Sequence, residues 1–373
     1  MKNKIVALIT LSAFSAAVLA GCGSSGTSSS TASTTAAAQT TTAETTAAAA
    51  ETTTAAAADS AGTEATEAAA SDDAMYDGKV LLGHSSWIGF APLNLADDMG
   101  FFEDHGVDCD IESFESKADS RAALAAGRIQ GVSTTVDTQV MSRSQGVNLQ
   151  IVLAEDTSSG GDGITAIDDI QEFTDLKGHT VALDTSGGAS YFWFQYLLKQ
   201  NDMSMDDMTI QNMSSGDAGA AFIAGQVDAA ITWEPWLSRA KESDNGHVLI
   251  DSTASPGIIV DCLAMDTDFA AQYPGTVKAI CEAWYDALDY MKTNPDEADK
   301  ILMQYTGDET VEALQGELDG VTFYDKAGNE EYFNREIQDV AKMASDLWLE
   351  NSLIDTAVDP DEICNGSFIS GVE

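Results

Sequence analysis

Small hydroxyl, acidic and aromatic side chains gather in four short segments, each directly after an apolar run that predicts a buried strand. Hydroxyl groups and backbone N–H groups at helix starts can hold an anionic group. Trp and Tyr rings supply flat apolar walls and faces for a cation. We therefore predict a binding site for a small solute, formed by Ser86, Trp87, Thr134, Thr135, Asp137, Asp184, Ser186, Ser190, Tyr191, Trp233, Glu234 and Trp236, with Asp261 on a further strand.

Four of these residues are acidic and none is Lys or Arg, which bears on the charge of the solute. Asp137, Asp184, Glu234 and Asp261 would repel a bare oxyanion, and they suit a solute that carries an amine or an aminopyrimidine. A zwitterion, which carries an amine and an anionic group, fits both halves of the predicted site. In the alternative interpretation, Asp137 and Asp184 cap helices, and Glu234 is a solvated or docking residue.

Catalytic chemistry finds little support in the sequence. The four His residues have no metal-ligand spacing, and no Gly-x-Ser-x-Gly motif is present. The Ser-x-x-Lys match at 238–241 is expected to be a helix surface. We predict no catalytic residue, no metal and no cofactor, and hence a binding protein rather than an enzyme.

Five cysteines are present, of which Cys22 belongs to the N-terminal segment. Cys109 and Cys281 lie on apolar faces of their expected elements and are predicted to be buried thiols. Pairing of Cys262 or Cys364 stays open, because four cysteines allow three connectivities.

Strand and helix patterns alternate along the chain and position these segments. Strands are expected at 79–84, 107–111, 129–134, 149–154, 163–167, 179–183, 209–212, 227–232 and 258–264. Helices are expected between them, and the chain after 275 is mainly helical. Such alternation predicts mostly parallel sheets with helices on both faces.

The α/β pattern occurs twice, which predicts a two-lobed fold with additional C-terminal helices. Gly- and Ser-rich crossovers near 156–163 and 251–257 divide it. We place one lobe at 76–160 and 252–373 and the other at 161–251. The carboxyl ends of strands from both lobes would then face a cleft that closes on the solute.

The N-terminal segments are not part of the expected fold. Residues 1–22 begin with Lys2 and Lys4, continue with an apolar stretch and end in Leu19-Ala20-Gly21-Cys22. They resemble a lipoprotein signal peptide whose lipobox cysteine, Cys22, becomes acylated. Residues 23–75 are rich in Ala, Thr and Ser and are predicted to form a disordered tether. The folded part is therefore expected outside the cytoplasm, anchored to the cell membrane by Cys22.

The charge of the chain excludes several partners. With 61 acidic and 17 basic residues, its formal net charge is −44. A nucleic-acid backbone would be repelled, so no nucleic-acid binding is expected. Electrostatic docking to an anionic membrane surface is disfavoured for the same reason.

Three segments carry a resemblance to a known family: Trp87 to Pro92 with Met99-Gly100-Phe101-Phe102, Ala123 to Arg128 with Ser133, and Gly225 to Trp236 with its Trp-Glu-Pro-Trp stretch. They resemble the substrate-binding proteins of ABC importers, in the group that binds nitrate, sulfonates and taurine and also thiamine pyrimidine precursors. The resemblance covers most of 80–304. It implies a type II periplasmic-binding-protein fold, with a permease and an ATPase complex as partners of a monomeric solute receptor.

Two other classes of function stay open beside that receptor. The eukaryotic pyrimidine synthase of thiamine biosynthesis has a similar fold, although the export signal and the lack of a Cys-rich motif disagree with it. The third class is a ligand sensor or adhesin on the cell surface. The sequence does not identify the solute.

Overall fold

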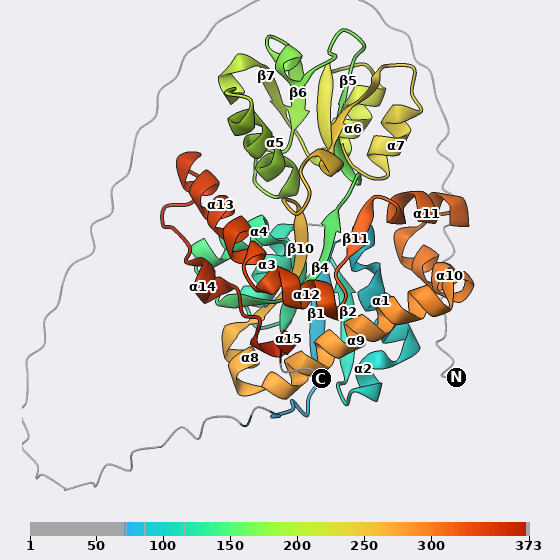
Figure 1. The fold of residues 1–373 in the computed structure, drawn as a ribbon, viewed down its shortest axis with the longest axis vertical. Coiled ribbons are helices and arrows are strands. Elements are labelled where there is room, and N and C mark those ends of the chain that lie inside the picture. The colour runs from blue at the N-terminus through green and yellow to red at the C-terminus, as the bar shows by residue number, and fades with distance from the viewer. Residues whose placement is uncertain (1–70, 72, 86, 115–116, 371–373) are drawn as a thin grey trace, which may run out of the picture. The chain divides into compact units, whose positions relative to one another are not determined.

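The computed structural model describes residues 71, 73–85, 87–114 and 117–370 (Figure 1). The predicted signal peptide, most of the tether, Cys22 and Ser86 lie outside the described residues. Within the described part, no helix combines the length and apolar character needed to cross a membrane.

The strands form two mixed sheets. The six-stranded sheet A has the order β11-β4-β10-β3-β1-β2, with β1 (Val80–His84), β2 (Cys109–Ser113), β3 (Gly131–Thr135), β4 (Leu149–Ser158), β10 (Val260–Asp266) and β11 (Val321–Phe323). The five-stranded sheet B has the order β7-β6-β8-β5-β9, with β5 (Asp162–Ala166), β6 (Thr180–Leu183), β7 (Thr209–Asn212), β8 (Ala229–Trp233) and β9 (His247–Asp251).

The expectation of mostly parallel sheets is wrong. In sheet A, β1 is parallel to β2 and β3, whereas β10 is antiparallel to β3 and β4, and β11 is antiparallel to β4. In sheet B, β5 is antiparallel to β8 and β9. Most of the antiparallel strands lie directly before or after a crossing of the chain between the two sheets. Such a strand is not joined across the crossing to a neighbour by a helix, which is the connection that makes two strands parallel. The two separate sheets and the helices that cover them otherwise agree with the expected two-lobed α/β fold.

Helices cover both faces of each sheet (Figure 1). One side of sheet A carries α1 (Ala91–Met99), α2 (Phe101–Asp104), α9 (Pro274–Thr293) and α10 (Pro295–Thr306). Its other side carries α4 (Val136–Ser144), α12 (Lys326–Phe333), α13 (Glu336–Glu350) and α14 (Pro360–Ile363). Sheet B lies between α5 (Ala189–Gln200) and the pair α6 (Ser215–Ile223) and α7 (Trp236–Lys241).

The remaining helices are short or peripheral. They are α3 (Lys117–Ala125), α8 (Thr267–Gln272), α11 (Val311–Leu318), α15 (Ser367–Ser370) and the 3-10 turns η1 (Ile88–Phe90), η2 (Phe173–Leu176), η3 (Met205–Asp207) and η4 (Ser252–Ala254). α1 and α2 are separate helices because Gly100 adopts the left-handed conformation between them. α12 and α13 are also separate.

Asn329 on α12 completes the hydrogen bonding of β4 where β4 lacks a strand neighbour. Its side-chain oxygen accepts from the Ala154 N–H at 2.8 Å, and its amide donates to the Ala154 carbonyl at 2.9 Å. The same amide donates to the carbonyls of Tyr324 and Asp325. Asn329 is fully buried, so these bonds satisfy groups that water cannot reach. Residues beyond Ala154 form an irregular register with β10, and this part of β4 leads to sheet B.

Candidate functional site

Strand ends of both sheets lie near the crossing between β4 and β5, and Trp87 packs on that crossing. The Trp87 indole N–H donates to Asp156 Oδ1 at 3.3 Å. A Cβ atom on Gly161 would lie 2.8 Å from the Trp87 ring, so only Gly allows the ring this close to the chain. Trp87 is half-buried, which leaves part of its ring surface accessible.

Two adjacent carboxyl groups are buried at the end of β4, and one of them is the Asp156 carboxyl that accepts the Trp87 hydrogen bond. Glu155 and Asp156 are both fully buried. Ser133 Oγ donates to Glu155 Oε1 at 2.7 Å, while Glu155 Oε2 and Asp156 Oδ2 have no hydrogen-bond partner. Burial raises the pKa of Glu155 well above its ordinary value, and burial together with the Glu155 carboxyl raises the pKa of Asp156 in the same direction.

The backbone explains how both acids come to lie together. The register between β10 and β4 shifts between Cys262 and Asp261, so that Asp261 pairs with Asp156 and Glu155 is an extra residue. Thr135 pairs with Asp261 on the other side of β10. Asp261 is 4% exposed and lies in the row between Thr135 and Asp156. Sequence alternation alone could not reveal this bulge.

The segment after β3 is largely occupied by contacts within the protein. Thr135 Oγ1 and Thr138 Oγ1 lie 2.9 Å apart. The carbonyl of Thr134 accepts from the Cys262 thiol at 3.3 Å. Asp137 lies in the first turn of α4 and is 2% exposed. Its backbone carbonyl accepts a hydrogen bond from the indole of Trp348 at 2.9 Å.

The segment after β6 divides into an exposed turn and a buried helix start. Asp184 Oδ1 accepts from the backbone N–H and hydroxyl of Ser186, at 2.9 and 2.6 Å. Asp184 therefore stabilises its own turn. Ser190 Oγ lies 3.0 Å from Ser215 Oγ, which joins the starts of α5 and α6. Tyr191 is buried against Trp348, with ring centroids 5.7 Å apart and an angle of 13° between the rings.

The segment after β8 contains one half-buried ring beside the crossing and one that packs on a helix. Trp233 is the last residue of β8 and pairs in register with Asp162, the first residue of β5. Trp236 packs on α6, because a Cβ on Gly219 would lie 2.7 Å from the Trp236 Cβ. The Arg239 guanidinium also lies 4.9 Å above the Trp236 ring.

Glu234 caps the helix that follows it. Its carboxylate accepts from the Ser238 N–H at 3.0 Å and the Ser238 hydroxyl at 2.8 Å. These bonds give Glu234 a local role that differs from the solvated or docking role considered in the alternative interpretation. Asp184 acts within a turn rather than as a helix cap.

The structure therefore arranges the predicted site residues in separate groups. Trp87, Trp233 and Asp261 lie on strands or turns next to the crossing. Asp137 and Tyr191 contact Trp348 from α13, a residue that sequence reasoning did not include. The remaining residues make contacts within their own turn or with a neighbouring helix: Asp184, Ser186, Ser190, Glu234 and Trp236.

The four cysteines within the described residues are unpaired thiols, and all four are buried. The expectation of buried thiols for Cys109 and Cys281 is confirmed. Burial raises the pKa of Cys364 to about 12, so it stays protonated. Cys262 and Cys364 do not form a disulfide here. Among the described residues, no group of three His, Cys, Asp or Glu residues is arranged to hold a metal ion.

Two sheets of this topology, joined by crossing strands, define the periplasmic-binding-protein class of fold. The aliphatic sulphonate binding protein SsuA of Escherichia coli superimposes with a TM-score of 0.68 at 21% identity, over 77% of this chain and 97% of that one. The nitrate-binding protein NrtA of Synechocystis does so with a TM-score of 0.54 at 16% identity, over 79% of this chain and 98% of its own. The desulfurization enzyme DSZB also shares the fold, with a TM-score of 0.57 at 14% identity, over 79% of this chain and 98% of that enzyme. The fold alone does not separate binding from catalysis.

Residues 87–298 match the family model described as NMT1/THI5 like, and the chain belongs to this family. A putative aliphatic sulfonates-binding protein of Bacillus subtilis is 25% identical over 293 residues, which are 75% of this chain and 84% of that protein. The taurine-binding periplasmic protein of Escherichia coli is 27% identical over 204 residues, 53% of this chain and 62% of its own length. These relatives are named as binding proteins, and the resemblance found in the sequence is confirmed.

Proposed function

We propose that this chain is the extracytoplasmic solute receptor of an ABC importer, without catalytic activity. The observation that carries the proposal is its membership of the NMT1/THI5-like family together with relatives named for binding sulfonates and taurine. A receptor of this kind binds a small solute between two lobes, closes, and delivers it to a permease and its ATPase.

The solute is proposed to lie beside the crossing of β4 and β5. Trp87 and Trp233 present half-buried rings there, one from each sheet. Thr135 and Asp261 are adjacent in register on sheet A. Rings and hydroxyl groups in this arrangement suit a compact solute with a polar head, such as taurine, an alkanesulfonate or nitrate. The relatives favour the sulfonates among these.

The two lobes are proposed to follow the sheets. Strands of sheet A lie at 80–158 and 260–323, and strands of sheet B lie at 162–251. Boundaries near 160 and 251 therefore coincide with the places where the chain passes from one sheet to the other. The chain is proposed to act as a monomer, held outside the cell membrane by acylated Cys22.

A thermal-shift screen followed by calorimetric titration tests the proposed function. The panel contains taurine, longer alkanesulfonates, nitrate, aminopyrimidines and amino acids. A sulfonate that binds with a stoichiometry of one and raises the melting temperature is the expected result. Binding of an aminopyrimidine alone would move the proposal to the pyrimidine-precursor branch. Turnover of any binding solute, detected by mass spectrometry of the mixture, would contradict a receptor without catalysis.

A further inference from the structure

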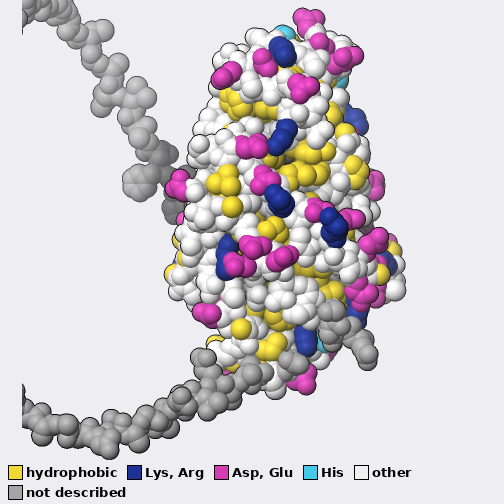
Figure 2. Space-filling view, turned by 60° about the vertical axis from the view of Figure 1, so that its left-hand side comes forward, with side chains coloured by type: hydrophobic (Ala, Val, Ile, Leu, Met, Phe, Trp, Pro, Cys, Tyr) yellow, Lys and Arg dark blue, Asp and Glu magenta, His cyan; other side chains and the backbone are white. Residues whose placement is uncertain are grey.

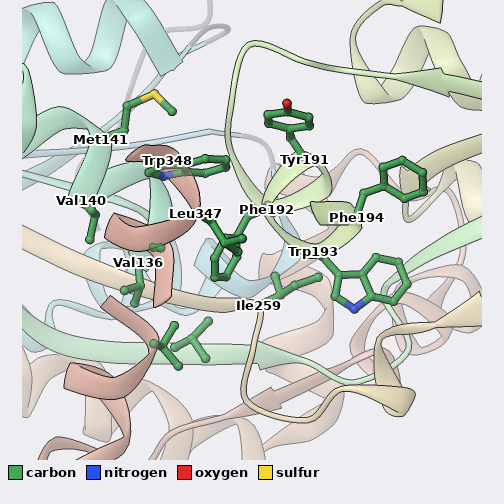
Figure 3. Packing of buried hydrophobic residues seen from close by; sticks show 14 of the residues in the cluster. Val136, Val140, Met141, Tyr191, Phe192, Trp193, Phe194, Ile259, Leu347 and Trp348 are labelled. Carbon is green, nitrogen blue, oxygen red and sulfur yellow. The ribbon is translucent and has the colours of Figure 1, made fainter. Parts of the chain in front are cut away.

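The C-terminal helix α13 contacts elements of both sheets (Figure 3). It packs along α4, which follows β3 of sheet A, and its C-terminal end reaches α5, which follows β6 of sheet B. Buried residues of sheet A, α13, α5 and sheet B form one continuous apolar cluster that includes Ile151, Trp348, Phe192 and Ile231.

Trp348 makes the most specific of these contacts. Its side chain is fully buried. The indole N–H donates to the carbonyl of Asp137 in the first turn of α4, at 2.9 Å. The ring stacks on Tyr191 in the first turn of α5, and its centroid lies 5.7 Å from that of Phe192. One side chain thus contacts a strand-end turn of each sheet (Figure 3).

Neighbouring contacts join the same elements. A side chain on Gly187, just before α5, would collide with Met141 of α4, so these two elements touch directly. Lys199 on α5 and Glu350 on α13 form an ion pair at 3.1 Å. Both members of that pair are more than half exposed, so it contributes little compared with the buried ring contacts. Figure 2 shows acidic and basic side chains interspersed on one face of the molecule.

We propose that Trp348 is a latch residue, which holds α5 of sheet B against α4 of sheet A in the empty protein. Separation of the two sheets at this edge would break the stack on Tyr191 and the bond to the Asp137 carbonyl. Breaking these contacts costs free energy whether or not a solute is bound, so the latch favours the closed arrangement of the two sheets. This inference rests on the proposed function in one respect, namely that the two sheets belong to lobes that open and close.

The latch determines how much of the free energy of solute binding is used to close the two lobes. When the closed state is already populated, less of the binding free energy is used to bring the lobes together. Loss of the latch lowers the closed fraction of the empty protein, and the apparent Kd rises in proportion. Trp348 acts here as a positioning residue, because its contacts are to the protein.

Distance measurement between two spin labels tests the latch without any solute. The full chain carries Cys22→Ser to prevent acylation, with Asp169→Cys after β5 and Asp268→Cys on α8. Both label positions are exposed, and the native cysteines of the described region are buried and unreactive by comparison. The distance distribution is recorded by pulsed electron resonance for this parent and for Trp348→Leu and Trp348→Phe.

Trp284 provides the matched control. It is also a fully buried Trp on a C-terminal helix, and its indole donates to the Tyr324 carbonyl at 3.2 Å. Its ring packs within the apolar cluster on the other side of sheet A, away from α5. Trp284→Leu therefore removes a buried Trp of the same size without touching the proposed latch.

Trp348→Leu is expected to add a population whose label distance is more than about 2 Å longer than in the parent. Trp284→Leu is expected to keep the parent distribution. Circular dichroism verifies that each variant is folded, and Trp348→Phe carries the test if Trp348→Leu is not. An unchanged distribution in a folded Trp348 variant would overturn the latch. If a solute nevertheless binds to the protein, that result refutes the latch and not the proposed function.

Discussion

The hydroxyl of Ser133 on β3 donates to the carboxyl of Glu155 on β4 across the intervening strand β10, at 2.7 Å. This bond joins two strands that are not neighbours in the sheet. Leu153 is in register with Leu263, and Leu263 is in register with Ser133, so alternation along β4 places Glu155 on the same side as Ser133. The bulge then brings Asp156 to that side as well, because Asp156 pairs with Asp261. The carboxyl that results is fully buried beside Asp156.

The two buried acids predict that stability falls as pH rises. Burial raises the pKa of Glu155 in the folded protein, so between its unfolded and its folded pKa the folded protein holds a proton that the unfolded chain has released. Its full contribution is present below the unfolded pKa of about 4.3. Above that pH, unfolding releases a proton, and each such group lowers the free energy of unfolding by up to about 1.4 kcal/mol per pH unit until the folded pKa is reached.

Glu155→Gln isolates this effect. The amide cannot ionise, so the slope of unfolding free energy against pH between about 5 and 8 should become less negative. Urea unfolding at several pH values measures the slope, and the slope rather than the absolute stability is decisive because an amide has its own hydrogen-bond needs. The exposed Glu312→Gln serves as control. Equal slopes in Glu155→Gln and the unmodified protein would show that Glu155 is charged when folded.

Asn329 predicts a large loss of stability when its side chain is removed. Asn329→Ala leaves the buried N–H and carbonyl of Ala154 without partners. Each unsatisfied group costs about 1–3 kcal/mol, so a decrease of at least about 2 kcal/mol in unfolding free energy is expected. Asn334 at the end of α12 is exposed, and Asn334→Ala should change stability by less than about 0.5 kcal/mol. Similar losses for both variants in urea titrations would refute the role of Asn329.

The sequence predicts well where strands end, since apolar runs and the polar residues after them are local features. Trp87 and Trp233 are therefore found beside the crossing that the Gly- and Ser-rich pattern marked. The antiparallel direction of β10 is not a local feature. It depends on the chain returning to sheet A after sheet B is complete, and no periodicity encodes that return.

The contacts of Glu234 and Trp348 show why the site could be predicted only in part from the sequence. Glu234 follows a strand end like a ligand residue, yet it bonds Ser238 four residues later, a pairing that competes with any ligand. Trp348 lies on an amphipathic helix, and its position in the sequence indicates only a core face. Its contact with Asp137 spans 211 residues, so only the folded chain reveals it.

The proposed lipobox ending at Cys22 predicts the outcome of a single substitution. Cys22→Ser removes the thiol that would be acylated, so radiolabelled palmitate should not be incorporated and the precursor should accumulate unprocessed. Cys109→Ser is the control, because Cys109 is a buried thiol within the fold and its loss should leave labelling intact. Label on the Cys22→Ser protein would refute the anchor.

Trp233 is predicted to form part of the solute-binding wall, with Trp236 as an internal comparison. The two residues are three positions apart in one segment and both are half-buried, but they have different neighbours. Trp236 packs on Gly219 and Arg239, whereas Trp233 lies beside Asp162. Trp233→Ala should weaken binding of the solute found in the screen by about 1–3 kcal/mol, the range for a desolvated aromatic contact.

The same substitution should change the melting temperature of the empty protein little, because part of the Trp233 ring is already accessible. Trp236→Ala should do the reverse, lowering stability through the lost packing on α6 while affinity is retained. Calorimetric titration of both variants beside melts of the empty proteins distinguishes these outcomes. Unchanged affinity in Trp233→Ala, combined with a loss of about 3–5 kcal/mol of stability, would make Trp233 a core residue and move the site away from the crossing.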